Sequence, residues 1–403
     1  MARKTKVSAT RGVVQVLLFT TFAVALALAQ PGDRQERFRE MSASAEARGL
    51  AEPYRGVTAN GELVYGLFPI ASTGVSTEAV VAAAHDFLQA LTQEQRGKTV
   101  FPADDPEWRK WMNQHFYLRQ GVSFAEMDEN QHKAAFALLE ASLSAKGLRL
   151  SRDIMRLNHT LGELNANNFE EYGEWLYWIT VMGDPSAGEP WGWQLDGHHL
   201  VVNYFVLGDQ VVMSPVFVGS EPAVAEAGKY AGTRVLQAEQ DEGLAMLQSL
   251  NDAQRHMAVL ELMKDGNNNL GEAFSDNIDL DYVGIPGALL SAAQRERLLG
   301  LIGLYVNNLR DGHAVLKMDE VERHLDDTYF AWIGGGEEDS VYYYRIFSPV
   351  ILIEFDHQKP ANLRHVYAPR PMRQHIHAVV RTPNGNDYGK DLLRQHYAQH
   401  PHE

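Results

Sequence analysis

One stretch near the C-terminal end is apolar on both of its alternating faces. Residues 350–355 read Val-Ile-Leu-Ile-Glu-Phe, with one carboxylate among five apolar side chains. Because successive side chains of a strand point to opposite sides of a sheet, such a run is typical of a central, buried strand. The chain is therefore expected to build a sheet around this segment, and Glu354 needs a partner inside it.

Other strand signals occur in two blocks. In the first block, Asp196-Gly197 and Gly208-Asp209 separate apolar runs, which predicts an antiparallel meander. The expected strands are 172–182, 189–195, 198–207 and 210–218 in the first block, and 328–333, 340–347, 349–356 and 373–381 in the second. Strands in blocks favour an α+β fold, with a mixed or antiparallel central sheet and helices packed mainly on one side.

Amphipathic or helix-favouring patterns lie before and between these blocks. Helices are expected over 77–92, 125–146, 148–165, 242–264, 291–309, 314–325 and 389–398. Thr77 is placed to cap the first helix, and Gly147 separates the second from the third. Residues 30–60 are expected to form a loose leader, and residues 61–403 a single large α+β domain.

The N-terminal segment has the pattern of a secretory signal. Four basic residues precede a long apolar run over 12–29, which ends in Ala27-Leu28-Ala29. This pattern predicts a signal peptide over 1–29 and a protein exported to the periplasm or the extracellular space. An uncleaved N-terminal anchor is the alternative, since the apolar run is nearly long enough to span a bilayer. No later stretch of the sequence is comparable.

Composition excludes several classes of protein. The sequence contains no cysteine, so thiol nucleophiles, thiolate metal sites, iron–sulfur clusters and disulfides are ruled out. The net charge is −16, and loss of the four basic residues of the signal would make it −20. Nucleic acid is therefore not an expected partner. Phosphate-binding glycine loops, H-E-x-x-H, G-x-S-x-G and dinucleotide motifs are also missing from the sequence.

The histidines point to a metal. His375 and His377 lie two residues apart in an expected strand, so their imidazoles share one face. Two such rings can converge on one divalent ion, and imidazole suits zinc, copper or iron. The third ligand is expected to be either His198 or His199, because adjacent strand residues face opposite ways. The alternative is that these histidines are ordinary polar residues on a half-exposed sheet face.

Glu354 and His357 are the candidate catalytic residues. A carboxylate in a buried strand must be paired, bind a metal or have a raised pKa. Glu354 is therefore a candidate fourth ligand or general base, and His357 lies three residues further along the same segment. The competing interpretation is a buried salt bridge from Glu354 to Arg345 or Arg381.

Aromatic residues offer a possible substrate site. Trp191 and Trp193 would share one strand face beside a turn, and with Arg381 they are the candidate substrate-binding residues. Aromatic side chains on a strand are more often part of the core than of a cleft. Residues 265–269, Asp-Gly-Asn-Asn-Asn, lack the full spacing of a calcium site and are expected to form a loop.

Together these features favour an exported metal-dependent enzyme, with hydrolysis and oxidative chemistry both open. A site of neutral imidazoles, one carboxylate and a divalent ion would carry positive charge, so a small anionic or carbonyl substrate suits it. The alternative is a non-catalytic envelope protein that binds a ligand in an aromatic cleft. A separation of the rings of His199 and His377 in the fold would remove the metal hypothesis.

Four motifs carry a resemblance to a known family. They are Gly183-Asp184-Pro185-Ser186 through Trp191-Gly192-Trp193-x-Leu195-x-Gly197-His198-His199, Ile353-Glu354-Phe355-Asp356-His357, His375-Ile376-His377, and Asp387-Tyr388-Gly389-x-Asp391-Leu392-Leu393. In combination the chain resembles a domain-of-unknown-function family of bacterial and fungal proteins that are often exported. The resemblance covers residues 77–398 and implies one continuous domain. It brings no established activity or ligand set.

Overall fold

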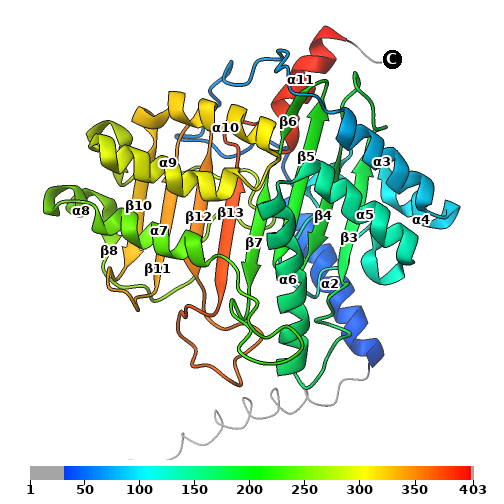
Figure 1. Ribbon diagram of the computed structural model, residues 1–403, viewed down its shortest axis with the longest axis horizontal. Coiled ribbons are helices and arrows are strands. Elements are labelled where there is room, and N and C mark those ends of the chain that lie inside the picture. Colours follow the sequence, from blue (N-terminus) through cyan, green and yellow to red (C-terminus); the bar gives the residue numbers. More distant parts are fainter. Residues whose placement is uncertain (1–30, 401–403) are drawn as a thin grey trace, which may run out of the picture.

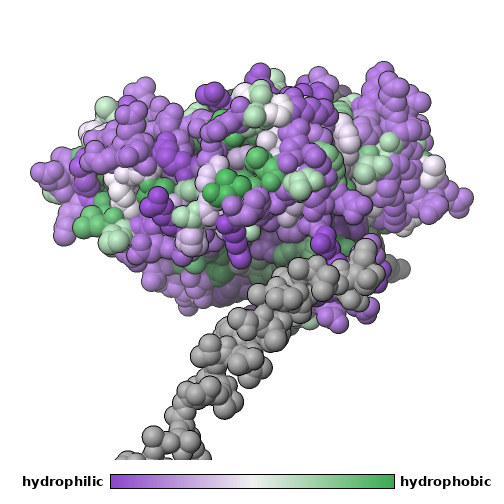
Figure 2. Space-filling model, turned by 90° about the horizontal axis from the view of Figure 1, so that it is seen from below, coloured by the Kyte–Doolittle hydropathy of each residue, from purple (hydrophilic) through white to green (hydrophobic). Residues whose placement is uncertain are grey.

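The computed structural model describes residues 31–400 of the chain. The predicted signal peptide, residues 1–29, lies outside these residues. Among the described residues, no helix combines the length and the apolar character needed to cross a membrane. Seen from below, the surface is mostly hydrophilic, with hydrophobic side chains in scattered groups (Figure 2).

One mixed sheet organises the described part of the chain, which confirms the predicted α+β class. Its main path runs β1-β3-β4-β5-β7-β13-β12-β11-β10-β8, while β2 pairs with β3, β6 with β5 and β9 with β10. The strands are β1 Val100–Phe101, β2 Val122–Ser123, β3 Tyr177–Met182, β4 Trp191–Gly197, β5 Leu200–Leu207, β6 Gln210–Val212, β7 Val216–Ser220, β8 Val259–Glu261, β9 Ile285–Pro286, β10 Tyr329–Gly334, β11 Tyr342–Phe347, β12 Leu352–His357 and β13 Ile376–Arg381. Only the β1–β3 and β8–β10 pairs of the described strands are parallel.

Most of the α-helices lie on one side of this sheet. The α-helices are α2 Pro31–Gly49, α3 Glu78–Ala90, α4 Gln93–Thr99, α5 Glu129–Ser142, α6 Ala145–Leu164, α7 Gln237–Gln248, α8 Asp252–Ala258, α9 Ala292–Val306, α10 Asp311–Arg323 and α11 Lys390–Gln399. The 3₁₀ turns are η1 Pro106–Arg109, η2 Phe124–Glu126, η3 Gly287–Leu289, η4 Leu325–Asp327 and η5 Asp387–Gly389. Helices α7, α9 and α10 lie over β10 to β13, and α3, α5 and α6 lie over β3 to β5 (Figure 1).

The two faces of the sheet differ in what covers them. On β13, Ile376 and Ala378 point to the helix-covered face, where they join the large apolar core beneath the helices. The alternate residues His377, Val379 and Arg381 point to the opposite face, which we call the loop-covered face. This second face contacts η1, η5, α11 and irregular segments, and its apolar cluster includes Trp108, Tyr388 and Leu392. The prediction of helices mainly on one side is thus confirmed.

Several local predictions were wrong. The predicted turn pair Asp196-Gly197 belongs to β4, and His198-His199 form the turn to β5. The expected loose leader is helical over Pro31–Gly49, and Ala45 is buried against Met112 and Tyr117. The break before α6 falls at Ser144 instead of Gly147, because the Ser144 hydroxyl caps the helix by accepting from the Gly147 N–H. The expected helix over 242–264 divides into α7, α8 and β8, because Asn251 forms a capping box that starts a new helix.

Candidate metal centre

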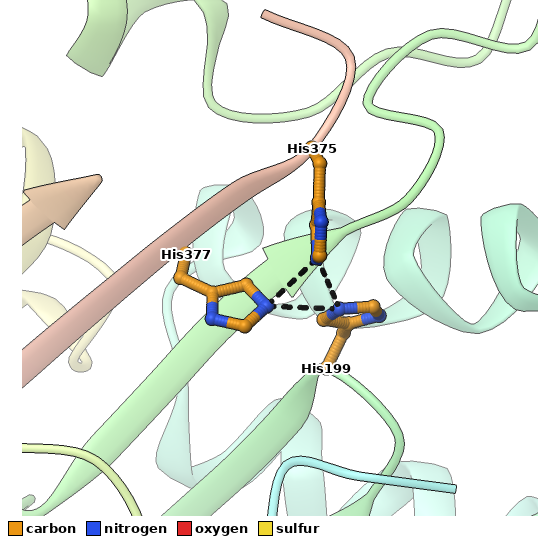
Figure 3. Close-up of side chains that lie close together, drawn as sticks. All are labelled: His199, His375 and His377. Carbon is orange, nitrogen blue, oxygen red and sulfur yellow. Dashed lines mark hydrogen bonds between the residues drawn. The ribbon is translucent and has the colours of Figure 1, made fainter. Parts of the chain in front are cut away.

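Three histidines from distant parts of the chain meet on the loop-covered face. The Nε2 atoms of His199 and His377 are 3.1 Å apart, those of His199 and His375 are 3.3 Å apart, and those of His375 and His377 are 3.0 Å apart. All three side chains are buried and point toward a common centre (Figure 3). We call these residues the triad; together they could hold a metal ion.

Strand order explains why these residues meet. His375 directly precedes β13 and His377 is its second residue, while His199 ends the tight turn that leads into β5. Strand β7 pairs with both β5 and β13, so it sets the two histidine segments one strand apart. On β7, Gly219 lies opposite His377, and its N–H donates to the His199 carbonyl over 2.9 Å.

A side chain at position 219 would intrude on the triad. A Cβ there would lie 3.3 Å from the Cδ2 atoms of both His199 and His377, and 2.5 Å from the Ile376 carbonyl oxygen. The glycine therefore leaves the room that the two imidazoles occupy. His199 itself has a φ of +62°, a left-handed conformation, and its ring points toward His375 and His377 (Figure 3).

Hydrogen bonds on the far side of two rings fix which nitrogens face the centre. The Nδ1 of His375 lies 2.7 Å from the Lys359 carbonyl oxygen, and the Nδ1 of His377 lies 2.6 Å from a Glu272 carboxylate oxygen. Both partners are acceptors, so each Nδ1 carries the hydrogen and each neutral ring presents an Nε2 lone pair. Two lone pairs then face each other over 3.0 Å, an arrangement that a bound cation would stabilise.

The spacing of the nitrogens fits a metal. With metal–nitrogen bonds of roughly 2.0–2.1 Å, two ligand nitrogens lie about 3.4 Å apart in a tetrahedron and about 2.9 Å apart in an octahedron. The separations of 3.0 to 3.3 Å fall between these values. Three imidazoles on one side of the ion would leave its other side open to water or a substrate.

Electrostatics also favour neutral, ligating imidazoles. Burial lowers the pKa of each of the three histidines, and the neighbouring imidazoles lower the pKa of His199 and His377 further. Burial raises the pKa of Glu272 to about 7, against the opposing effect of its hydrogen bond from Asn269. A positive ion beside His377 would favour the charged form of this carboxylate, as in the carboxylate–histidine–metal arrangement of many sites.

Glu354 holds the loop that carries Glu272. It lies on the loop-covered face and accepts hydrogen bonds from the backbone N–H groups of Leu270 and Gly271 and from the Tyr343 hydroxyl. The structure thus gives Glu354 hydrogen-bond partners in the loop and on β11, and not the salt bridge to Arg345 or Arg381 that was the competing interpretation. It does not place Glu354 among the residues that can hold the ion. Its catalytic role stays a prediction.

Asp356 fixes the same loop two residues further along β12. Its carboxylate accepts from the Asn268 N–H over 2.6 Å and pairs with the Lys264 ammonium over 2.7 Å, with both side chains almost fully buried. The residues 265–269 therefore form a loop, as expected, and the carboxylates of β12 anchor it over the triad. The loop positions Glu272, whose second oxygen accepts from the Asn113 side-chain amide over 3.4 Å.

His357 lies on the other side of the sheet. Its Nδ1 accepts from the Tyr342 N–H over 3.0 Å, and its Nε2 contacts the Gln240 side-chain oxygen over 3.0 Å. The ring packs beside Phe355 on the helix-covered face. The structure therefore does not bring His357 to the triad. Side chains alternate between the two faces along β12, so His357 points away from the face of Glu354 and Asp356.

Of the two adjacent histidines, His199 joins the triad and His198 does not. His198 binds the Asn158 side-chain oxygen through Nδ1 over 2.8 Å, and its Nε2 lies 3.5 Å from the Asn362 amide. Its ring stacks on His199 with the centroids 4.0 Å apart. Only one of the two adjacent histidines therefore contributes to the triad, as expected. The left-handed backbone conformation of His199 determines that it is His199.

The remaining candidates, Trp191, Trp193 and Arg381, are all enclosed. Both tryptophans have no exposed surface and belong to the core of the helix-covered face, so they line no aromatic cleft. Arg381 is also fully buried, and its guanidinium pairs with Asp276 and Asp387, each over 3.0 Å. All three side chains are therefore enclosed by contacts within the protein, although they were the candidate substrate-binding residues.

Sequence reasoning missed Glu272, Asn113 and Gly219. Glu272 lies in an irregular loop, and only tertiary anchoring by β12 brings it to His377. Asn113 follows η1 and reaches the site through its carbonyl, which accepts from the His199 N–H over 3.1 Å. Gly219 offered one usable signal, since a glycine within an apolar strand often marks a close approach.

Comparisons with known proteins place the chain without assigning it an activity. A family model described as "Protein of unknown function (DUF3500)" matches residues 73–390, which include the whole triad. No curated protein and no solved structure matches the chain. The site must therefore be interpreted from its own geometry.

Proposed function

Since the chain belongs to the DUF3500 family, whose description gives no activity, we propose from the geometry of the triad that it is an exported metal-dependent enzyme. The observation that supports the proposal is the convergence of three Nε2 atoms within 3.3 Å of one another, two of them with their far nitrogens held by acceptors. Hydrogen bonding among neutral imidazoles alone leaves at least one pair of lone pairs opposed.

The proposed ligands are His199, His375 and His377, and the proposed ion is zinc, copper or iron. A divalent ion with three imidazole ligands acts as a Lewis acid, and its open position can lower the pKa of water or accept a small molecule. Within the protein, Glu272 orients His377 and contributes negative charge, while the Lys359 carbonyl orients His375. Hydrolytic and oxidative reactions both fit this ligand set.

Burial favours a small substrate. The triad histidines expose between 2% and 7% of their surface, whereas the Glu272 side chain is 26% exposed. Access to the proposed ion is therefore expected from the side of Glu272. Three neutral imidazoles, one carboxylate and a divalent ion leave a net positive charge, which suits a small anionic or carbonyl substrate.

Elemental analysis of the untagged protein tests the metal. We expect about one metal ion per chain in the wild type, and its loss in His375→Ala and His377→Ala. His198→Gln is the matched control, since it alters the adjacent histidine that faces away from the centre. Equal metal content in the wild type and both triad variants would refute the site, and so would loss of the ion only in the control.

Cobalt substitution and rate measurements test the chemistry. A tetrahedral cobalt site absorbs visible light more strongly than an octahedral one, so the spectrum reports the number of open positions. Rates for ester hydrolysis, carbon dioxide hydration and peroxide turnover are then compared between the loaded wild type and His377→Ala. Loss of one rate in the variant identifies the reaction class, and a metal without any such rate would favour a structural site.

Export is a separate part of the proposal and rests on the N-terminal sequence pattern. N-terminal sequencing of the protein from the producing cell's envelope or medium is expected to begin near Gln30. Recovery of the full-length chain in the membrane fraction would instead support the uncleaved anchor.

A further inference from the structure

A second feature lies on the helix-covered face, on the opposite side of the sheet from the triad. An open cavity of about 620 Å³ forms where the end of α5, the first turns of α6 and the start of α10 meet (Figure 1). Four of the eleven residues that line it are arginines, and two are acidic. In a chain with 36 basic and 52 acidic residues, this cavity reverses the overall charge balance. The arginines are Arg149, Arg152, Arg156 and Arg310, and the acidic residues are Glu140 and Asp311.

Three of the arginines share one side of α6. With about 3.6 residues per helical turn, positions 149, 152 and 156 fall within an arc of roughly 60° and extend over roughly 10 Å of the helix. Arg310 adds a guanidinium from a distant part of the chain, directly before α10. Because like charges this close together repel one another, an anion among them would be stabilising.

Contacts within the protein hold two of these guanidiniums in place. Arg310 donates to the Glu140 carbonyl oxygen over 3.0 Å, which ties the start of α10 to the end of α5. The Arg152 guanidinium lies over the ring of Phe136, 4.8 Å from its centroid. Neither contact neutralises the charge of the arginine, so both guanidiniums stay available to an anion.

Most of the positive charge in the cavity is not paired. Arg156 forms an ion pair with Asp153 over 2.9 Å. Within residues 31–400, no carboxylate forms an ion pair with Arg149, Arg152 or Arg310. Three guanidiniums of the wall therefore remain without an acidic partner.

Two helices also begin at this cavity. Helix α6 starts at Ala145 and helix α10 at Asp311, and both residues line the cavity. The first N–H groups of a helix lack partners within the helix and lie at the positive end of its dipole. The side chain of Arg310, at the N-cap position of α10, makes no capping hydrogen bond. The helix ends thus add to the positive potential of the arginines.

The charges of the wall restrict the class of ligand. Glu140 and Asp311 oppose any anion that enters, so a ligand with a single charge gains little. Three unpaired guanidiniums suit a ligand with several anionic groups. Arginine binds phosphate oxygens through two parallel hydrogen bonds, which makes phosphate the best match. The net charge of −16 repels an anionic membrane surface, which favours a soluble ligand over a lipid headgroup.

We propose that this cavity binds a soluble small molecule that carries two or more phosphate groups. The phosphate oxygens accept hydrogen bonds from the guanidiniums of Arg149, Arg152 and Arg310, while Leu143 and Leu148 supply apolar surface for a carbon skeleton. The volume lies within the range of small-molecule sites in proteins. The sheet separates this site from the triad, and the proposal does not depend on the function proposed for the triad.

A series of phosphate probes tests the assignment. Titration calorimetry of the full-length protein compares inorganic phosphate, pyrophosphate and tripolyphosphate. We expect one tripolyphosphate per chain, bound roughly 10- to 100-fold more tightly than phosphate, because it contacts several guanidiniums at once. The variant His377→Ala should give the same affinities, which excludes binding at the triad. Absence of saturable binding, or equal affinities for phosphate and tripolyphosphate, would overturn the proposal.

Parallel sedimentation with vesicles separates the two sources of phosphate. With phosphatidylcholine vesicles that contain phosphatidylinositol bisphosphate, the protein is expected to stay in the supernatant. Sedimentation with these vesicles that is lost in Arg149→Gln/Arg152→Gln would overturn the assignment to a soluble ligand.

Paired variants locate the site. Arg149→Gln/Arg152→Gln should weaken tripolyphosphate binding at least about tenfold, and both side chains are exposed, so the fold should persist. Arg37→Gln/Arg39→Gln removes the same charge from α2, outside the cavity, and should change the affinity less than about twofold. Glu140→Gln removes an opposing charge and should tighten binding about two- to fivefold, a gain that misfolding cannot produce. Equal losses in the two double variants, or no gain in Glu140→Gln, would place the ligand elsewhere.

Discussion

The two faces of the sheet are stabilised in different ways. Beneath the helices, strand residues such as Ile353, Phe355 and Tyr344 form a continuous apolar core. On the loop-covered face, the same strands present Glu354, Asp356 and other charged or polar groups, although these side chains are equally buried. Both faces exclude water, so the difference lies in what covers them.

The covering segments explain this difference. A helix satisfies its own backbone hydrogen bonds, so the strands beneath it need to supply only apolar contact. An irregular segment cannot do so, and the sheet must supply donors and acceptors. Glu354 accepts from the Leu270 and Gly271 N–H groups, and the Arg381 guanidinium donates to the Gly271 carbonyl. The face that can orient metal ligands is therefore the face that already contains a polar network.

The largest effect is expected from breaking the buried ion cluster of the loop-covered face. Arg381→Met leaves Asp276 and Asp387 buried without their shared cation. We expect a loss of about 3–5 kcal/mol in the free energy of unfolding, measured by urea denaturation. Adding Asp387→Asn to this variant should restore part of the loss, because Asp276 keeps its ion pair with Arg109 over 2.7 Å. No recovery in the double variant would show that the packing of the Arg381 side chain, and not its charge, dominates the stability of this cluster.

The next effect concerns the carboxylate that orients His377. Glu272→Ala should weaken metal binding about 10- to 100-fold, because the ring loses the acceptor that fixes its tautomer. Glu272→Gln keeps an acceptor and should show a smaller loss, and the exposed Glu338→Ala should show none. Competition with a chromophoric chelator measures the affinities. Identical affinities in the wild type and Glu272→Ala would remove Glu272 from the site.

A pH effect should also originate on the loop-covered face. Burial raises the pKa of Glu107 from 4.5 to about 7, against the opposing attraction of Lys110. Between these values the folded state holds more protons than the unfolded state, so the contribution of Glu107 to stability falls as the pH rises. Glu107→Gln should remove this fall and gain on the order of 2 kcal/mol relative to the wild type at pH 8.

Thermal unfolding at pH 5 and pH 8 measures this effect. The difference between Glu107→Gln and the wild type should be larger at pH 8 than at pH 5. A constant difference across this range would mean that Glu107 does not titrate as expected.

The smallest effect is expected on the helix-covered face. Ile353→Val removes one methylene group from a fully buried position and should cost about 0.5–1.5 kcal/mol. It should leave both metal content and the pH dependence unchanged, because no polar contact is altered. A change in metal affinity in this variant would show that the two faces are coupled through β12.

The sequence predicts those parts of the fold and site that depend on local periodicity. The two-residue period of a strand brings His375 and His377 together, and the pair Gly208-Asp209 correctly locates the turn between β5 and β6. The pair Asp196-Gly197 was wrong, because both residues belong to β4. The choice between His198 and His199 depends on one backbone angle in a turn, which residue types alone do not set. The same two-residue period places Glu354 and His357 on opposite faces of β12. It therefore separates the two residues that were predicted to be catalytic.

Contacts between distant segments could not be inferred in this way. Glu272 reaches His377 only because carboxylates of β12 bind the backbone of its loop. Thr77 illustrates the same limit, since its hydroxyl donates to the Gly208 carbonyl over 2.7 Å instead of capping α3. Such pairings depend on which segments become neighbours in the folded chain.

The position of β13 between β7 and β12 has a consequence for when the protein is completed. This strand is the last of the described strands in the sequence, yet it joins the two halves of the sheet. It contains His377 and directly follows His375, so it positions two of the three histidines. A ribosome must therefore release the chain as far as β13 before the ligands can assemble. For a chain that crosses a membrane unfolded, the ion would have to be acquired in the destination compartment, so the supply of metal there, and not in the cytoplasm, would decide which ion the protein carries.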